Sequence, residues 1–317
     1  MERGEPFGSP FLKEKEEGLT MGKKRKQVRI FLAAFCFLLP FLVLYSLFTI
    51  WPVIQGFYVS MHKWTLMGKQ EFIGFENYLD FLGDKSFWGA LKNTFKFVLI
   101  TCPMLVVVAL SLALLANRPT RMKRSLRIIY YLPSVLSVSI ASLIAGSVFA
   151  PYKGLLNGVL VWAGIIKAGE DLQFLMDKSL VWVTVSTMTV WWTVGFSMLL
   201  FVSALQEISP EMYEAAEIDG ATKSQQLRRI VLPLLKPTIW LVILLQTLAC
   251  FKVFGQIFNI TGGGPANSTR PIIQYIYESA FEKGKMGYAA SMSYVLFAIL
   301  LVFSLIQQKI QRKGESR

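Results

Sequence analysis

The sequence is poor in the side chains on which most catalytic and metal sites depend. Its 317 residues include one histidine and three cysteines. The histidine, His62, falls in a predicted loop, where we expect it to lie at the surface, and one imidazole supports neither a histidine-based nucleophile nor a zinc cluster. Cys36, Cys102 and Cys250 all lie in apolar runs, where a thiol behaves as a small hydrophobe. We therefore expect no catalytic residues, no metal site and no disulfide framework.

Nucleotide-binding chemistry is missing as well. The sequence contains no G-x-x-x-x-G-K-[ST] motif, the glycine-rich loop whose backbone cradles ATP phosphates. The chain is therefore expected to be neither an ATPase nor another kind of enzyme, and to bind no cofactor of its own.

Long apolar runs, in contrast, dominate the chain. Hydrophobic residues make up 54% of it, which excludes an ordinary soluble domain. A helix that crosses a membrane needs about 20 predominantly apolar residues. Runs of suitable length occur at residues 30–50, 95–116, 128–149, 180–205, 238–254 and 288–306. The sequence thus predicts an all-α, polytopic membrane protein with six transmembrane helices, kinked at Pro40, Pro103 and Pro133.

These six runs contain no aspartate and no glutamate. Carboxylates inside the membrane are a common means of coupling transport to protons or other ions. Their absence disfavours an ion-coupled secondary transporter, which we keep only as an alternative.

Basic residues cluster in every second segment outside the apolar runs. The formal net charge is +13, and basic residues cluster at 23–29, 118–127, 223–236 and 309–317. Because short cytoplasmic segments retain Lys and Arg, we predict that both termini are cytoplasmic. The clusters flank apolar runs and lack interleaved aromatic residues, so we expect no nucleic-acid binding. Residues 1–28 show no helical periodicity and are predicted to form a disordered, basic cytoplasmic tail.

A polar segment, residues 209–233, stands between the fourth and fifth runs. Ser209 can cap a helix that begins with Pro210, and Gly220 can end it. Thr222 and Gln225 have the spacing of a capping box, in which a hydroxyl and an amide satisfy two backbone N–H groups. We therefore predict a helix, a glycine corner and a second helix.

This hairpin also carries a family motif. Glu214-Ala215-Ala216 is followed after three residues by Gly220, and after nine more by Ile230-Val231-Leu232-Pro233. The segment resembles the coupling loop of permeases from binding-protein-dependent ABC importers. The resemblance implies that residues 29–317 form one transmembrane permease domain, with a cytoplasmic coupling helix between spans four and five. It implies contacts with an ATPase subunit through Glu211, Met212, Glu214, Ala215, Ala216, Asp219 and Gly220.

Two loops expected on the outer side narrow the resemblance. One is Gly74-Phe75-Glu76-Asn77-Tyr78, and the other is Thr261-Gly262-Gly263-Gly264-Pro265. Both resemble loops of carbohydrate permeases of the maltose-transport branch. They imply a sugar or oligosaccharide as the solute, with a glycerol phosphate or similar polyol as the alternative, because such permeases share these loops. The resemblance implies a binding-protein contact at Gly262, Gly263, Gly264 and Pro265.

The resemblance also implies partners and a location. Permeases of this family work in pairs on two ABC ATPase subunits, which bind the ATP, and an extracytoplasmic solute-binding protein delivers the solute. The long basic N-terminal tail and the Gly-Gly-Gly-Pro loop point to a different second permease and hence a heterodimer, with a homodimer as the alternative. The chain is expected in a prokaryotic cytoplasmic membrane, as a multi-pass protein surrounded by lipid.

Two stripes of polar and aromatic residues are candidates for the solute pathway. A sugar needs hydroxyl or amide partners for its OH groups and a flat apolar surface for its CH face. Helical spacing places such residues together in the fourth and fifth runs: Thr189, Trp192, Thr193 and Phe196, and Gln246, Ala249, Cys250 and Val253. The same residue types suit helix packing in membranes, so the spacing leaves both interpretations open.

Overall fold

The computed structural model describes residues 29–117, 123–167 and 169–315, so the predicted tail lies outside the described residues. The chain divides into two units, Met1–Tyr58 and Val59–Arg317. A helix begins in the first unit at Arg29 and reaches Ser60. It includes a wider π-helical turn, η1 (Ser46–Ile50), and continues as α2 (Trp51–Ser60). The predicted first span falls inside this helix.

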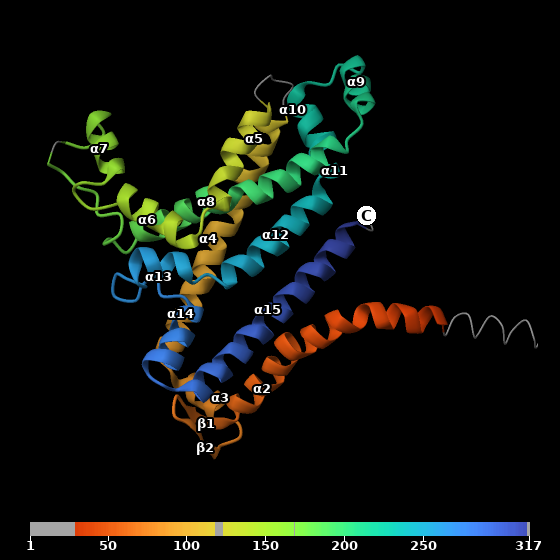
Figure 1. Ribbon diagram of the computed structural model, residues 1–317. Coiled ribbons are helices and arrows are strands. Elements are labelled where there is room, and N and C mark those ends of the chain that lie inside the picture. The colour runs from red at the N-terminus through yellow and green to blue at the C-terminus, as the bar shows by residue number, and fades with distance from the viewer. Residues whose placement is uncertain (1–28, 118–122, 168, 316–317) are drawn as a thin grey trace, which may run out of the picture. The chain divides into compact units, whose positions relative to one another are not determined.

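The second unit is helical apart from one small hairpin, which confirms the predicted class. In chain order its elements are β1 (His62–Thr65), β2 (Gly68–Phe72), α3 (Glu76–Asp80), η2 (Phe81–Gly83), α4 (Lys85–Ala116), α5 (Lys123–Tyr131), η3 (Leu132–Val135), α6 (Val138–Val148), α7 (Leu155–Trp162), α8 (Leu180–Gln206), α9 (Pro210–Ile218), α10 (Lys223–Gln226), η4 (Leu227–Val231), α11 (Leu232–Leu234), α12 (Lys236–Phe251), α13 (Gly255–Thr261), α14 (Ile272–Tyr277), η5 (Glu278–Glu282) and α15 (Met286–Glu315) (Figure 1). Strands β1 and β2 pair antiparallel.

Four helices of the described chain are long and apolar enough to cross a membrane: Arg29–Ser60, Lys85–Ala116, Leu180–Gln206 and Met286–Arg312. Two further spans are bent pairs, Arg124–Val135 with Val138–Val148, and Lys223–Leu234 with Lys236–Phe251. Counting each pair as one span gives six, at the six predicted places.

The bent pairs differ from the smooth helices that the sequence predicts. The third span turns by 100° after η3, so Pro133 marks a break and not the predicted kink. Proline offers no N–H to the helix ladder, and Leu136 then becomes extended before Ser137 caps α6 by accepting from the N–H of Ile140 at 3.4 Å. The fifth span bends by 64° between Leu234 and Lys236. Pro103, by contrast, lies inside the continuous helix α4.

The centre of the second unit is the packing of α4 against α8. Lys96 lies over the ring of Trp182, and one turn further along both helices Thr101 donates a hydrogen bond to Ser186 at 2.9 Å. The two helices therefore run in the same direction. Small side chains on α4 let the helices approach closely near their C-terminal ends, where Ala109 and Ala113 are fully buried.

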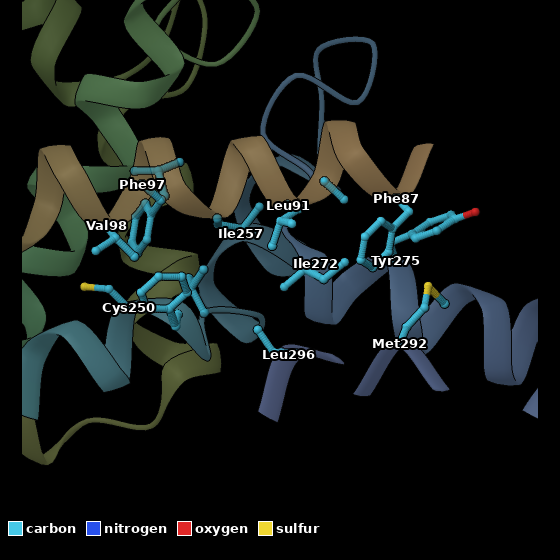
Figure 2. Packing of buried hydrophobic residues seen from close by; sticks show 14 of the residues in the cluster. Phe87, Leu91, Phe97, Val98, Cys250, Ile257, Ile272, Tyr275, Met292 and Leu296 are labelled. Atoms are coloured by element: carbon cyan, nitrogen blue, oxygen red, sulfur yellow. The ribbon is translucent and has the colours of Figure 1, made fainter. Parts of the chain in front are cut away.

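A hydrophobic cluster joins α4 to three other elements. Figure 2 shows Phe87, Leu91 and Phe97 on α4 facing Ile272 of α14 and Leu296 of α15. The rings of Phe95 and Phe251 meet edge to face at 5.1 Å, which brings α12 to the same core. This packing fixes the N-terminal half of α4 against α12, α14 and α15.

Candidate functional site

The polar hairpin has the predicted form. Ser209 occupies the cap position and Pro210 begins α9, although the Ser209 side chain makes no capping hydrogen bond, so that detail of the prediction is wrong. The helix ends at Ile218, and Gly220 follows with φ +76°, a conformation that L side chains rarely adopt. The corner therefore depends on glycine for its backbone and not for space, because nothing lies within 4 Å of an added Cβ.

The capping box at the second helix is confirmed. The N–H of Gln225 donates to the Thr222 hydroxyl at 3.3 Å, and the N–H of Thr222 donates to the Gln225 side-chain oxygen at 2.7 Å. Lys223 donates to Glu217 across the corner. The hydrogen bond from Lys223 and the positive charge of Lys223 lower the pKa of Glu217 below its ordinary value. These contacts hold α9 and α10 in one arrangement.

The coupling residues named by resemblance lie on the outer surface of this hairpin. Tyr213 packs against the hydrophobic cluster at the C-terminal ends of α4 and α8 and so anchors α9. Ala216 is half-buried, and the other six are exposed: Glu211, Met212, Glu214, Ala215, Asp219 and Gly220. Ile218, at the end of α9, is 87% exposed and adds an apolar side chain to this surface, which the sequence-based prediction does not include. Its position two residues after the Glu-Ala-Ala motif could have indicated it as a further contact candidate.

The glycine loop is held in place by side chains. Gly262 and Gly263 adopt φ +59° and +88° after α13. The Gln274 amide donates to the carbonyl of Gly262 at 2.9 Å, and Thr269 donates to the carbonyl of Gly264 at 2.6 Å. A Cβ on Gly263 would lie 2.9 Å from the Gln274 amide nitrogen. Pro265 is half-buried beside these glycines, so the four residues form a fixed loop.

The candidate pathway stripe on α8 runs from buried to exposed. Thr189 is buried and Thr193 half-buried, and each hydroxyl donates to a carbonyl one turn back, at 2.8 and 2.7 Å. The indole N–H of Trp192 donates to the carbonyl of Leu136 at 3.0 Å. Phe196 is 50% exposed.

The stripe on α12 lies deeper. The Gln246 amide is buried and donates to the Ser197 hydroxyl on α8 at 2.9 Å. Helix α12 ends at Phe251, so Val253 lies beyond the helix and the predicted helical stripe is wrong at that residue. Cys250 and Val253 belong to the hydrophobic core, whereas Ala249 is exposed. Within this chain the positions of Cys250 and Val253 favour packing, and Gln246 comes close to the α8 stripe through Ser197.

A polar cavity at the other end of α4 is a feature that the sequence analysis did not anticipate. It has a volume of about 670 Å³ and lies among β1, β2, α3, η5 and the start of α15. Its charged lining consists of Lys63, Glu71, Glu76, Asp80, Asp84, Lys283 and Lys285. Among the described residues, no three Asp, Glu, His or Cys side chains lie close enough to hold a metal ion.

The wall of this cavity explains why the prediction for His62 is wrong. His62 is only 2% exposed, because β1 packs on α15 at Gly287, where a Cβ would lie 2.0 Å from the His62 carbonyl oxygen. The buried amide of Asn77 donates to that same oxygen at 3.1 Å. The imidazole contacts the Phe72 ring edge-on at 5.1 Å. The missing side chain of Gly287 thus lets the β1–β2 hairpin pack closely against α15.

Asp84 forms the floor of the cavity and joins three helices. It accepts from the N–H of Ser86 at 2.8 Å, which caps α4, and from the hydroxyls of Tyr275 on α14 and Tyr288 on α15. Partial burial would raise the pKa of Asp84, but these hydrogen bonds outweigh it and lower the pKa below its ordinary value. Burial and the bond to Asp84 raise the pKa of Tyr275 to about 12, so its hydroxyl stays a donor.

The fold and the hairpin together define a class of protein. The described helices include up to six candidate membrane spans, and an exposed polar hairpin with a capped second helix stands between the fourth and the fifth. This is the architecture of a multi-pass membrane protein that presents an exposed polar segment at one end of its helices.

Comparison with known proteins gives the family. Residues 98–314 match the family described as binding-protein-dependent transport system inner membrane component. The chain belongs to this family, and it is therefore a multi-pass permease subunit of the bacterial inner membrane type and not an enzyme.

Individual relatives span almost the whole chain. The sulfoquinovosyl glycerol transport system permease SmoG of Agrobacterium fabrum is 33% identical over 89% of this chain and 91% of its own length. The lactose transport system permease LacF of Rhizobium radiobacter is 32% identical over 86% of this chain and 91% of its own. A solved bacterial alginate ABC transporter, in complex with an alginate pentasaccharide-bound periplasmic protein, contains a chain of the same fold. It has a TM-score of 0.78 and 24% identity, and the match covers 91% of this chain and 96% of that one.

Proposed function

We propose that this chain is one of two membrane subunits of an ATP-driven importer for a sugar or oligosaccharide. The observation that carries the proposal is the hairpin at residues 209–233, an exposed helix, a left-handed glycine corner and a capped second helix. Membership of a binding-protein-dependent family supports the importer. The solutes for which its relatives are named, lactose and sulfoquinovosyl glycerol, support a carbohydrate.

In this proposal the hairpin is cytoplasmic. α4 and α8 run in the same direction, so the segment after α4 and the hairpin after α8 lie at one end of the unit. Arg124 and Arg127 follow α4, and Arg228 and Arg229 lie in the hairpin. Positive charge on both segments supports a cytoplasmic location.

The partners are two ATPases, a second permease of different sequence and an extracytoplasmic solute-binding protein. The outer surface of α9 docks on the ATPase, and Tyr213 transmits its movement to the ends of α4 and α8. The corner at Gly220 and the capping box tie α9 to α12, so that the hairpin moves as one body. The second permease completes the pathway. This chain offers to it Thr189, Trp192, Thr193 and Phe196 on α8, Gln246, Ala249 and Cys250 on α12, and Val253 just after α12.

Co-purification tests the proposal. The tagged chain, extracted from native membranes, should bring with it an ABC ATPase and a second permease, and the complex should hydrolyse ATP faster when sugar-loaded binding protein is added. The ligand of that binding protein would identify the substrate. A chain that purifies alone and moves solute on an ion gradient would contradict the proposal.

A further inference from the structure

The cavity beneath the β1–β2 hairpin holds exposed charges of both signs. Glu71, Glu76 and Asp80 line it with carboxylates, and Lys63 and Lys285 with ammonium groups, and all five side chains are exposed. In the described part of the chain, the ion pairs are Lys223 with Glu217 and Arg270 with Glu278, and neither involves these five. Lys63 and Glu71 stand directly opposite each other on β1 and β2, so Glu76, Asp80 and Lys285 are the charges that the cavity leaves for something outside the chain.

The rings in the cavity argue against a sugar as its occupant. A sugar stacks its CH face on an open aromatic ring. The Tyr275 ring, however, already has the Arg270 guanidinium and the Lys283 ammonium group over it, each 4.8 Å from its centroid. Charged side chains make up much of the remaining lining, which suits a protein surface.

The carboxylates have a geometry that fits a basic side chain. Glu76 and Asp80 stand four residues apart, at the two ends of α3, and so lie on one face of that helix. A Lys or Arg side chain that enters there can meet both carboxylates, while Lys63 and Lys285 can meet an acidic neighbour on the same partner loop.

We propose that this cavity is the docking seat for a charged surface loop of the solute-binding protein, with a basic side chain of that loop held by Glu76 and Asp80. The proposal rests on the proposed function and adds to it the surface and the chemistry of docking. The cavity lies at the opposite end of α4 from the coupling hairpin, which places it on the outer side of the membrane. Its floor, Asp84, links the seat to α14 and to the starts of α4 and α15.

The test uses the complete transporter in lipid nanodiscs with its sugar-loaded binding protein. The double variant Glu76→Gln with Asp80→Asn should raise the binding-protein concentration that gives half-maximal ATPase stimulation about tenfold, because steering charges are lost. Added NaCl should weaken docking of the wild type and have much less effect on the double variant. The matched control is Glu282→Gln, which removes an exposed carboxylate of η5 outside the cavity and should behave as the wild type.

Four results would overturn the proposal. An unchanged half-maximal concentration in the double variant would show that the cavity takes no part in docking. An equal shift in Glu282→Gln would show that the effect comes from general surface charge. ATPase stimulation by free sugar alone, lost in the double variant, would make the cavity a carbohydrate site. A wild-type transporter that the binding protein does not stimulate would contradict the proposed function itself, and the docking seat with it.

Discussion

At the scale of single residues, two glycines are needed for different physical reasons. Gly220 has open space around its Cβ position but a φ of +76°, whereas Gly195 on α8 faces the backbone of the preceding span. A Cβ at Gly195 would lie 2.7 Å from the carbonyl oxygen of Tyr130 and 2.7 Å from the Cα of Tyr131. One glycine sets a backbone conformation, and the other permits a close approach of helices.

Replacing Gly220 should uncouple ATP hydrolysis from transport. A β-branched residue in the left-handed region costs about 1 to 2 kcal/mol, so Gly220→Val should distort the corner and reduce sugar uptake per ATP hydrolysed in the reconstituted transporter. Gly220→Asn is the control, because asparagine tolerates this conformation, and it should keep most of the coupling. Full coupling in Gly220→Val would remove the corner from the mechanism.

Replacing Gly195 should destabilise the bundle itself. The methyl group of Gly195→Ala meets backbone atoms that cannot turn aside, and overpacking of this kind costs about 1 to 3 kcal/mol. The melting temperature in detergent should therefore fall. Gly89→Ala offers the comparison, since that helical glycine has nothing within 4 Å of its Cβ position and alanine favours the helix. Equal melting temperatures for both variants would contradict the close approach seen at Gly195.

At the scale of elements, Asp84 joins the starts of α4 and α15 to α14, and the stability of this joint should depend on pH. Because the folded pKa of Asp84 lies below its ordinary value of 3.8, the unfolded chain binds the proton more readily. The stability from ionised Asp84 is complete above the ordinary pKa and is lost as the pH falls through the folded pKa.

The measurement is thermal melting of Asp84→Asn beside the wild type. The variant should melt at a lower temperature at a pH of about 6, and the difference should shrink once the pH falls below 3.8. Asp80→Asn removes an exposed carboxylate of the same cavity that accepts no hydrogen bond in the described chain, and its melting should match the wild type. A difference between Asp84→Asn and wild type that stays constant with pH would contradict the role of the charge.

Local rules predicted those elements whose cause is local. Apolar runs located all six spans, and the spacing of Thr222 and Gln225 gave the capping box, because both depend on neighbouring residues only. The sequence predicts a kink at Pro133, yet a 100° turn follows, since the capped start of α6 stabilises a new direction that no periodicity encodes. The buried His62 and the polar cavity beside it depend on Gly287, more than two hundred residues away in sequence, so local patterns do not reveal them.

At the scale of the whole molecule, the docking seat and the coupling hairpin require opposite sides of the membrane. The parallel packing of α4 and α8 places them at opposite ends of the second unit, so one accessibility experiment tests both assignments. The experiment uses a cysteine-free variant of the chain that carries Cys36→Ser, Cys102→Ala and Cys250→Ala. Alanine keeps the two buried sites apolar.

A single cysteine introduced at each of the two sites then shows on which side of the membrane that site lies. Thr65→Cys, at the rim of the cavity, should react with a membrane-impermeant maleimide in spheroplasts, whereas Ser224→Cys, in the hairpin, should react only after the membrane is permeabilised. Positive charge at 223–236 and mixed charge around the cavity give the physical reason for this orientation. Labelling of Ser224→Cys from outside would reverse the orientation and would contradict both the ATPase contact and the binding-protein seat. Labelling of both positions without permeabilisation would show that the two ends of α4 and α8 do not lie on opposite sides of the membrane.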